Sequence, residues 1–457
     1  MSGAAASPFA LRGVIEGFYG NPYTQEQRLE LVDFLAAHGM NTFVYGPKDD
    51  PLVRARWRDP YDGGALHRLA ELVNRCRARD VQLMYCVSPG LSMRYSDPDD
   101  MDALVAKLAS VADLGVDAFG LLLDDIPMEL QHAEDRVAFS DLAEAHADVI
   151  RTLASRLGPD RHLAVCPTVY WGRGDETFIA RLGAAIPGDV DLFWTGRAIC
   201  SPTLDLDDAR RFELATGRAP LYWDNYPVND VAMTFELHIG PYLGRDPRLA
   251  EASRGIIANP MELFEASKIP LATIADYLRD PAAYDAEACW AAAIREVAGQ
   301  ADAGAFALFA DNVRSSCLSA GDAPVVGTAL EAFAFRLDRG EGRAAAADLA
   351  ALADRLVAAA HHLLHGPVEN TALVDDCRPW IEAFELGAQA IRRIAGLAAE
   401  DRLATEARTE LIPYLARLRR ARVRVFGDAL DMTLADLTGT HVRPGRMLEL
   451  ERGGDSA

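Results

Sequence analysis

Hydrophobic and polar positions follow two periods in the first part of the chain. From residue 11 to roughly residue 260, short apolar runs alternate with longer stretches that have the period of an amphipathic helix. This alternation predicts parallel strands joined by crossover helices. Eight such runs separated by helices favour a closed (β/α)8 barrel over an open sheet. The runs are Leu11–Ile15, Thr42–Gly46, Gln82–Val87, Ala118–Leu123, Leu163–Cys166, Val190–Trp194, Pro220–Trp223 and Gly255–Ala258.

The stretches between these runs predict the helices of the barrel. They are Gln25–His38, Ala65–Asp80, Asp100–Leu114, Phe139–Leu157, Thr177–Ala185, Asp207–Thr216 and Met261–Leu278. Between the last two strands, Gly240, Pro241, Gly244 and Pro247 are typical of turns. We therefore expect an irregular loop over the active face at this point.

The pattern changes after residue 280. Ala, Leu, Arg and Glu dominate the segments Ala329–Arg339, Gly342–Leu364, Trp380–Ala399 and Asp401–Val425, which predicts a helical bundle. Gly366–Pro367 and Arg378–Pro379 are expected to mark helix boundaries. The fold class is thus α/β, with a (β/α)8 TIM barrel over residues 1–280 and an α-helical bundle domain over residues 281–457.

Composition and charge narrow the classes of partner. A net charge of −22 repels phosphate backbones and anionic membranes, so we expect no nucleic-acid and no membrane partner. The start MSGAAASPFA lacks the features of a signal peptide, and no apolar run is long enough to span a bilayer, so we expect a cytoplasmic protein. The seven cysteines have no zinc or redox spacing, and we expect reduced thiols.

The strongest candidate for chemistry is the motif GLLLDDIP at residues 120–127. Working residues of a barrel lie just beyond the carboxyl ends of its strands, and Asp124 and Asp125 directly follow the predicted fourth strand. Two adjacent carboxylates at such a place tend to divide into one protonated and one ionised group. A helix cap or a divalent-cation site are the alternatives, and the place at the barrel's mouth favours catalysis over them.

Other strand ends carry residues that suit a neutral sugar. The first ends in RGVIEGFYGNPYT, where Gly13, Gly17 and Gly20 allow tight turns and a close approach to a ligand. The second ends in YGPKDDP with Lys48, the fifth in CPTVYWG and the seventh in LYWDNYPVND, and Asn259 follows the eighth. Aromatic faces stack on pyranose C–H groups, while amides and carboxylates bind hydroxyls. A simple turn and a solvated surface lysine are the ordinary alternatives, but five such strand ends together favour a sugar site.

The motifs EGFYG, YGPKDDP, LLLDDI, CPTVYWG and WDNYPVND, in this order and spacing, resemble glycoside hydrolase family 84, the O-GlcNAcases and related β-N-acetylglucosaminidases. The resemblance covers residues 11–280 and implies a barrel followed by a bundle that can border the substrate groove. It implies that Asp124 orients and polarises the substrate's acetamido group, and that Asp125 is the general acid and then the general base. The substrate-binding residues it implies are Gly17 through its backbone, Lys48, Tyr170, Trp223, Asn225, Asp230 and Asn259, with Tyr170 and Trp223 shaping the acetamido pocket.

The resemblance also implies a mechanism, which is substrate-assisted retention through an oxazoline with no metal or organic cofactor. We expect an exo-acting enzyme that removes β-linked N-acetylglucosamine from glycosylated proteins or from other conjugates. The alternatives are a hyaluronidase-like glycosaminoglycan hydrolase and a catalytically silent sugar-binding protein. The physiological aglycone and the oligomeric state stay open, although the bundle offers surface for a dimer.

A weaker signal lies in the predicted bundle. His361, His362 and His365 have a spacing that allows two imidazoles on one helical face, as a metal site requires. No acidic residue with the usual pattern of such motifs follows them. We therefore expect a partly exposed helical face here and no metal site.

Overall fold

The computed structural model describes residues 7–440. Residues 1–6, which belong to the start MSGAAASPFA from which we expect no signal peptide, lie outside the described part. The chain divides into two compact units. The first comprises Met1–Asp230, Tyr242–Phe264 and Leu271–Asp285, and the second comprises Val231–Pro241, Glu265–Pro270 and Ala286–Ala457. Each unit is described by itself below.

The first unit contains a closed barrel of eight parallel strands, which confirms the predicted (β/α)8 fold. Each strand pairs with the next one along the chain, and β1 pairs with β8 to close the ring. Because all strands run in the same direction, their carboxyl ends meet at one end of the barrel, which we call the mouth. The strands are β1 (Leu11–Glu16), β2 (Thr42–Tyr45), β3 (Gln82–Val87), β4 (Ala118–Leu122), β5 (His162–Cys166), β6 (Asp191–Trp194), β7 (Leu221–Asp224) and β8 (Gly255–Ala258).

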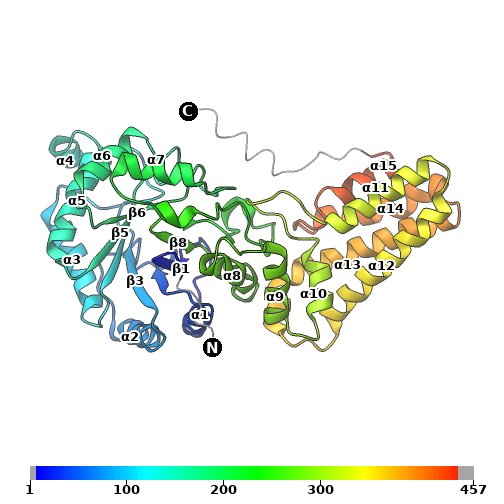
Figure 1. Ribbon diagram of the computed structural model, residues 1–457, viewed down its shortest axis with the longest axis horizontal. Helices are drawn as coiled ribbons and strands as arrows, with labels where there is room; N and C mark the ends of the chain where they lie inside the picture. The colour runs from blue at the N-terminus through cyan, green and yellow to red at the C-terminus, as the bar shows by residue number, and fades with distance from the viewer. Residues whose placement is uncertain (1–6, 441–457) are drawn as a thin grey trace. The chain divides into compact units, whose positions relative to one another are not determined.

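Helices connect the strands and surround them (Figure 1). Their first turns are stabilised locally, since Thr24 and Gln27 form a reciprocal capping box at the first helix and Asp62 caps the second. The helices are α1 (Gln25–Ala37), α2 (Gly63–Ala78), α3 (Pro98–Ala112), α4 (Ala133–Ala138), α5 (Leu142–Leu157), α6 (Thr177–Ala185), α7 (Leu206–Thr216) and α8 (Phe264–Arg279).

The predicted helix Phe139–Leu157 is wrong at its start. The backbone of Phe139 is extended, and Asp141 caps α5 by accepting a hydrogen bond from the backbone N–H of Glu144. The short helix α4 precedes this break and was not predicted. A capping carboxylate two residues inside the predicted start decides the boundary, because it satisfies an N–H group of the first turn that has no partner within the helix.

The inside of the barrel is packed with apolar side chains. Ile15, Val44, Met84 and Leu122 from four neighbouring strands are fully buried and belong to one cluster. Burying each such side chain stabilises the fold by about 1.5–3 kcal/mol. On β1 only glycine fits at position 13, because a Cβ atom there would lie 1.8 Å from the backbone oxygen on the neighbouring strand β2.

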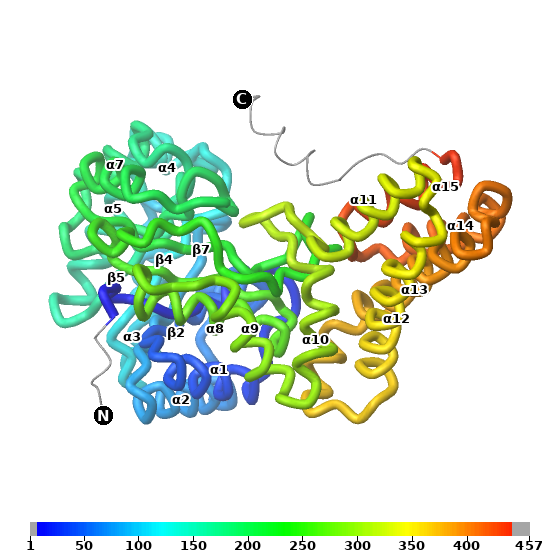
Figure 2. Tube along the Cα trace, turned by 45° about the vertical axis from the view of Figure 1, so that its right-hand side comes forward, coloured from blue at the N-terminus to red at the C-terminus, as the bar shows by residue number. Residues whose placement is uncertain are grey.

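The second unit is helical, which confirms the predicted bundle. Helix α12 packs on α11 and α13, and α14 packs on α13 and α15; Figure 2 shows these helices side by side. No helix among the described residues combines the length and the apolarity needed to cross a bilayer. The helices are α9 (Ala286–Ala298), α10 (Ala303–Ala310), α11 (Pro324–Asp338), α12 (Gly342–His365), α13 (Thr371–Ala399), α14 (Leu403–Arg420) and α15 (Ala429–Thr438).

The expected helix boundary at Arg378–Pro379 is wrong, because α13 continues through Pro379. Proline inside a helix removes one hydrogen bond and costs about 3 kcal/mol. Buried residues on both sides of the proline, among them Cys377 and Phe384, keep this stretch on the core of the bundle. Tertiary packing therefore outweighs the local preference.

A buried ion pair anchors the loop between β7 and β8 to the end of β7. Arg245 donates two hydrogen bonds to Asp224, at 2.6 and 3.0 Å, and both side chains are almost fully shielded from solvent. The same guanidinium also donates to the backbone oxygens of Pro202 and Leu243. Because Asp224 stands between Trp223 and Asn225, this pair also holds two predicted site residues in place.

We expect Arg245→Met to lower the free energy of unfolding by about 3–5 kcal/mol, because it leaves a buried carboxylate without its cation. Denaturant unfolding followed by tryptophan fluorescence measures the change. Arg210→Met is the matched control, since the Arg210–Glu251 pair is about half exposed and is worth at most about 1 kcal/mol. Equal effects of the two substitutions would contradict a structural role of the buried pair.

Candidate active site

The predicted site residues gather at the mouth of the barrel. They lie at or shortly after the ends of β1, β2, β4, β5, β7 and β8. Hydrogen bonds and ring contacts, some of them made through Tyr19, connect them into one cluster. No predicted member lies apart from the rest. The residues brought together are Gly17, Lys48, Asp124, Asp125, Tyr170, Trp223, Asn225, Asp230 and Asn259.

Lys48 and Asp124 form a buried ion pair at the centre of the cluster. Only 5% of Lys48 and 4% of Asp124 are exposed, so the solvated surface lysine considered from sequence is excluded. Burial alone would lower the pKa of Lys48, but the charge and the hydrogen bond of Asp124 outweigh it and the pKa ends above its usual value. The lysine therefore remains a cation.

The two oxygens of Asp124 have different surroundings. Oδ2 accepts a hydrogen bond from Lys48 Nζ. Oδ1 is buried and has no hydrogen-bond partner among the described residues. A buried acceptor without a partner costs free energy of about 1–3 kcal/mol, which a ligand N–H group at this place would recover.

Asp125 is exposed, although it directly follows a buried residue. Its backbone is left-handed, with φ of +54°, a conformation that aspartate tolerates better than most residues. In an extended strand, neighbouring side chains point to opposite faces, and the left-handed turn breaks this alternation. Both carboxylates can therefore interact with a ligand at the mouth of the barrel.

Two tyrosine hydroxyls hold the carboxylate of Asp125. Tyr19 donates to Oδ2 at 2.7 Å and Tyr170 donates to Oδ1 at 2.8 Å. Burial raises the pKa of both tyrosines, and the neighbouring Asp125 raises it further, so both hydroxyls keep their protons. The carboxylate thus has two fixed donors and remains open to solvent.

A chain of hydrogen bonds links the first, seventh and eighth strands. The backbone N–H of Gly17 donates to Asn259, whose side-chain amide donates to Asn225 at 3.0 Å. Asn225 also accepts from the indole N–H of Trp223 at 2.9 Å, and it donates to a backbone oxygen in the loop after β6. A Cβ atom at Gly17 would lie 2.6 Å from the Trp223 ring, so glycine is required for this close packing.

Tyr19 and Arg54 are site residues that the sequence analysis missed. Arg54 donates to the Tyr19 hydroxyl at 3.1 Å and its guanidinium lies 5.4 Å from the ring centroid. Tyr19 lies in the EGFYG motif, next to the glycines that were noticed, so its position was the available signal. Arg54 lies in a run of turns after β2 and carries no sequence signal of its own.

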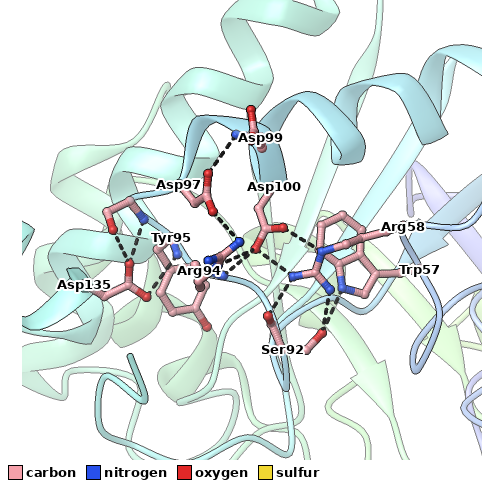
Figure 3. A network of polar contacts seen from close by, with 10 residues as sticks. Trp57, Arg58, Ser92, Arg94, Tyr95, Asp97, Asp99, Asp100 and Asp135 are labelled. Carbon is pink, nitrogen blue, oxygen red and sulfur yellow. Dashed lines mark hydrogen bonds and ion pairs between the residues drawn. The ribbon is translucent and has the colours of Figure 1, made fainter. Parts of the chain in front are cut away.

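A polar network fixes the loops that follow β2, β3 and β4 (Figure 3). Asp100 accepts two hydrogen bonds from Arg58 and one from the backbone N–H of Arg94. Asp135, at the start of α4, accepts from the backbone N–H of Tyr95. The loops that begin at Lys48 and at Asp125 are therefore tied to each other through the loop between them.

The arrangement offers two carboxylates with separate tasks. One is buried, pinned by a cation and open at a single oxygen, and the other is exposed between two hydroxyl donors. Aromatic rings and amides from four further strand ends surround them. Among residues 7–440, no three His, Cys, Asp or Glu ligand atoms converge at this mouth closely enough to hold a metal ion.

Comparison with known proteins finds similarity over most of the chain. The sequence profile of a family described as beta-N-acetylglucosaminidase matches residues 12–311. The protein O-GlcNAcases of Rattus norvegicus and Mus musculus are each 32% identical over 275 residues, which is 59% of this chain. The matched part is only 30% of the length of those curated relatives.

Two solved structures extend the similarity over nearly the whole chain. A mutant of the O-GlcNAc hydrolase of Thermobaculum terrenum has a TM-score of 0.89 and 31% identity, and the match covers 98% of both chains. The structure of CpGH84B has a TM-score of 0.82 and 26% identity, and it covers 94% of this chain and 77% of the other. The similarity therefore includes the helical unit as well as the barrel.

Ionisation of the Asp230 carboxylate lowers the free energy of unfolding of the protein. It accepts a hydrogen bond from the backbone N–H of Tyr19 at 2.7 Å, yet burial raises its pKa above the usual 3.8. The folded state thus binds this proton more tightly than the unfolded state. The resulting contribution to stability is present below the unfolded pKa and is lost as the pH rises through the folded pKa.

We therefore expect Asp230→Asn to gain stability relative to wild type as the pH rises from below 3.8 towards neutrality. Urea unfolding midpoints of both proteins across this pH range measure the difference. Asp160→Asn, which removes an exposed carboxylate, controls for the loss of one negative charge. A difference that stays constant with pH, or shrinks as the pH rises, would contradict the raised pKa.

Proposed function

The chain belongs to the β-N-acetylglucosaminidase family of glycoside hydrolases, and we propose that it removes terminal β-linked N-acetylglucosamine with retention of configuration. The observation that carries the proposal is the pair of carboxylates at the end of β4. Asp124 offers a buried acceptor, and Asp125 offers an accessible group that can give and take a proton. Substrate-assisted cleavage requires these two groups and no enzyme nucleophile.

Asp124 acts on the acetamido group of the sugar. In the first step the acetamido oxygen bonds to the anomeric carbon, the bond from that carbon to the aglycone oxygen breaks, and positive charge develops on the forming oxazoline. Oδ1 of Asp124 accepts a hydrogen bond from the acetamido N–H. This hydrogen bond makes the acetamido oxygen more nucleophilic and stabilises the developing positive charge. Lys48 holds the other oxygen, so the carboxylate is oriented before the substrate arrives.

Asp125 transfers the proton in both steps. It first protonates the departing aglycone oxygen as general acid. It then takes a proton from the water that attacks the anomeric carbon, the oxazoline bond breaks, and the acetamido group is restored. The hydroxyls of Tyr19 and Tyr170 stabilise the carboxylate between the two steps, because each already donates to one of its oxygens.

The remaining residues of the cluster form the sugar site. Lys48, Asn225, Asp230, Asn259 and the backbone of Gly17 supply polar partners for the sugar hydroxyls. Trp223 and Tyr170 form the walls of the acetamido pocket. The hydrogen bonds among these groups keep them in position, so little order has to be created when the sugar binds.

The aglycone lies outside this sugar site. Trp171 is 44% exposed and follows Tyr170 in the loop after β5. Ile199 is 48% exposed in the loop after β6, and its backbone oxygen accepts a hydrogen bond from Asn225. They offer apolar surface to a peptide or to another conjugate. The similarity to protein O-GlcNAcases supports glycosylated Ser or Thr residues of proteins as the substrate class.

The predicted cytoplasmic location fits the thiols of the chain. None of the seven cysteines, all within residues 7–440, forms a disulfide, and Cys200, Cys289 and Cys317 are partly exposed. Exposed thiols persist in a reducing compartment, whereas oxidising compartments promote disulfides. This supports a cytoplasmic enzyme.

We expect wild type to hydrolyse an aryl β-N-acetylglucosaminide and to leave the matching aryl β-glucoside uncleaved, because the glucoside has no acetamido oxygen to attack the anomeric carbon. Release of the aryl group measures both rates, and proton NMR of the first product should show the β-anomer. Comparable cleavage of both sugars would exclude the substrate-assisted route. Binding of the acetamido sugar without turnover of either substrate would indicate a sugar-binding protein.

We expect Asp125→Asn to slow cleavage of a poor leaving group, such as an alkyl glycoside, by about 10²–10⁴-fold and to spare an activated aryl glycoside much more. General acid assistance matters least when the leaving group already departs easily. Values of kcat/KM over a series of leaving groups measure this, and a steeper dependence on leaving-group acidity is the expected signature.

Asp124→Asn provides the contrast at the adjacent position. It removes the charge that stabilises the oxazoline, so we expect an activity loss of about 10²–10³-fold that does not depend on the leaving group. Equal losses on good and poor leaving groups for Asp125→Asn would refute its assignment as the acid.

A further inference from the structure

Three potential metal ligands meet on the surface of the helical unit. His361 and His365 lie one turn apart at the end of α12, and their ring centroids are 4.9 Å apart. Glu385 comes from the neighbouring helix α13. One ligand atom from each of the three residues lies within 4.8 Å of the other two.

None of these three side chains has another polar partner among the described residues. His361 and His365 are exposed, and Glu385 is half-buried. His362 on the same turn behaves differently, because its Nε2 lies 2.6 Å from a carboxylate oxygen of Asp302. His362 is thus held by Asp302, while His361 and His365 lie near the carboxylate of Glu385, which forms no ion pair with any residue between 7 and 440.

The carboxylate is the group that the sequence analysis found lacking. Glu385 lies twenty positions beyond His365 and on another helix, so no local motif contains it. The packing of α12 on α13 brings it to the histidines. At the opposite end of α12, Arg343 forms an exposed ion pair with Asp401, which lies just beyond the end of α13.

The ligand set selects the class of ion. Two imidazoles and one carboxylate suit zinc and neighbouring transition metals, whereas calcium and magnesium prefer oxygen ligands alone. Ligand atoms around a tetrahedral zinc ion are about 3.3 Å apart, given metal–ligand distances of about 2.0–2.1 Å. The present separations are within 4.8 Å, so the three exposed or half-buried side chains have to rotate towards one another to bind an ion.

We propose that His361, His365 and Glu385 bind one divalent transition-metal ion of the zinc class, with water completing the coordination sphere. The ion bridges α12 and α13 and therefore stabilises the helical unit. The net charge of −22 favours a cation at the surface of this chain. This site is separate from the carboxylates of the barrel and does not depend on the proposed activity.

The test is a titration of the chelator-treated full-length chain with Zn²⁺, followed by calorimetry. We expect one equivalent to bind, and we expect His365→Ala and Glu385→Gln each to weaken binding by at least about 10- to 100-fold, since even the loss of a group that only supports a ligand has this cost. His67→Ala is the matched control, because His67 is an exposed histidine on α2 of the barrel. It should bind Zn²⁺ like wild type.

Titration with Co²⁺ identifies the ligands by absorption. We expect the visible bands of a tetrahedral ion with nitrogen and oxygen ligands, and no sulfur-to-metal charge-transfer band in the near ultraviolet. Such a band would assign the ion to partly exposed cysteines and overturn the proposal. Binding that survives in both His365→Ala and Glu385→Gln, or no binding to wild type, would overturn it as well. Hydrolysis of the aryl substrate should be the same for all variants with and without Zn²⁺, which separates this test from the proposed function.

Discussion

The ion pair between Lys48 and Asp124 is the constraint on which the rest of the site depends. Removing two opposite charges from water costs several kcal/mol for each ion, and only their mutual attraction and good hydrogen-bond geometry offset it. The pair joins the end of β2 to the end of β4 across the intervening strand. Once Asp124 is fixed in this way, its free oxygen and the neighbouring Asp125 are fixed as well. Oδ1 of Asp124 is buried without a hydrogen-bond partner among the described residues. A substrate group that donates a hydrogen bond to this oxygen is therefore bound tightly and in a defined orientation.

Adjacent residues perform different tasks because the backbone turns between them. The strand carries Asp124 inward, and the left-handed conformation at Asp125 presents the next carboxylate to solvent between two tyrosines. These tyrosines come from the ends of β1 and β5, on either side of β4 around the ring. The proton-transfer group is thus held from several directions, which a single loop does not provide.

The sequence predicted the barrel well because buried parallel strands are apolar runs with clear limits. The bounds of β3 and β8 agree with the prediction residue for residue. The errors lie where a long-range or side-chain interaction overrides the local pattern. The helix α13 continues through Pro379 because the bundle core holds it, and Asp141 caps α5 two residues inside the start predicted from the amphipathic pattern. Residue positions along a strand end could be inferred, and all nine predicted residues do lie together.

The partners of these residues could not be inferred in the same way. A solvated surface lysine was the ordinary alternative for Lys48, and the burial that excludes it follows from packing against Asp124, 76 positions away. Tyr19 and Arg54 join the site only through the folded arrangement of the loops. Which oxygen is satisfied and which is free is likewise a property of three-dimensional packing, and it is this detail that distinguishes a binding residue from a reacting one.

The closure of β1 on β8 has a consequence for how the chain is made. Gly17 and Asn259 touch each other although 242 positions separate them, so the site does not exist until the eighth strand has left the ribosome. At a synthesis rate of about 5–20 residues per second, the nascent barrel carries two unpaired strand edges for on the order of ten seconds or more. During that time the short strands and the charged helices between them must keep the open edges from pairing with other chains. A chain interrupted before residue 255 would retain every carboxylate, every aromatic ring and the lysine of the site and still lack the closed barrel that positions them.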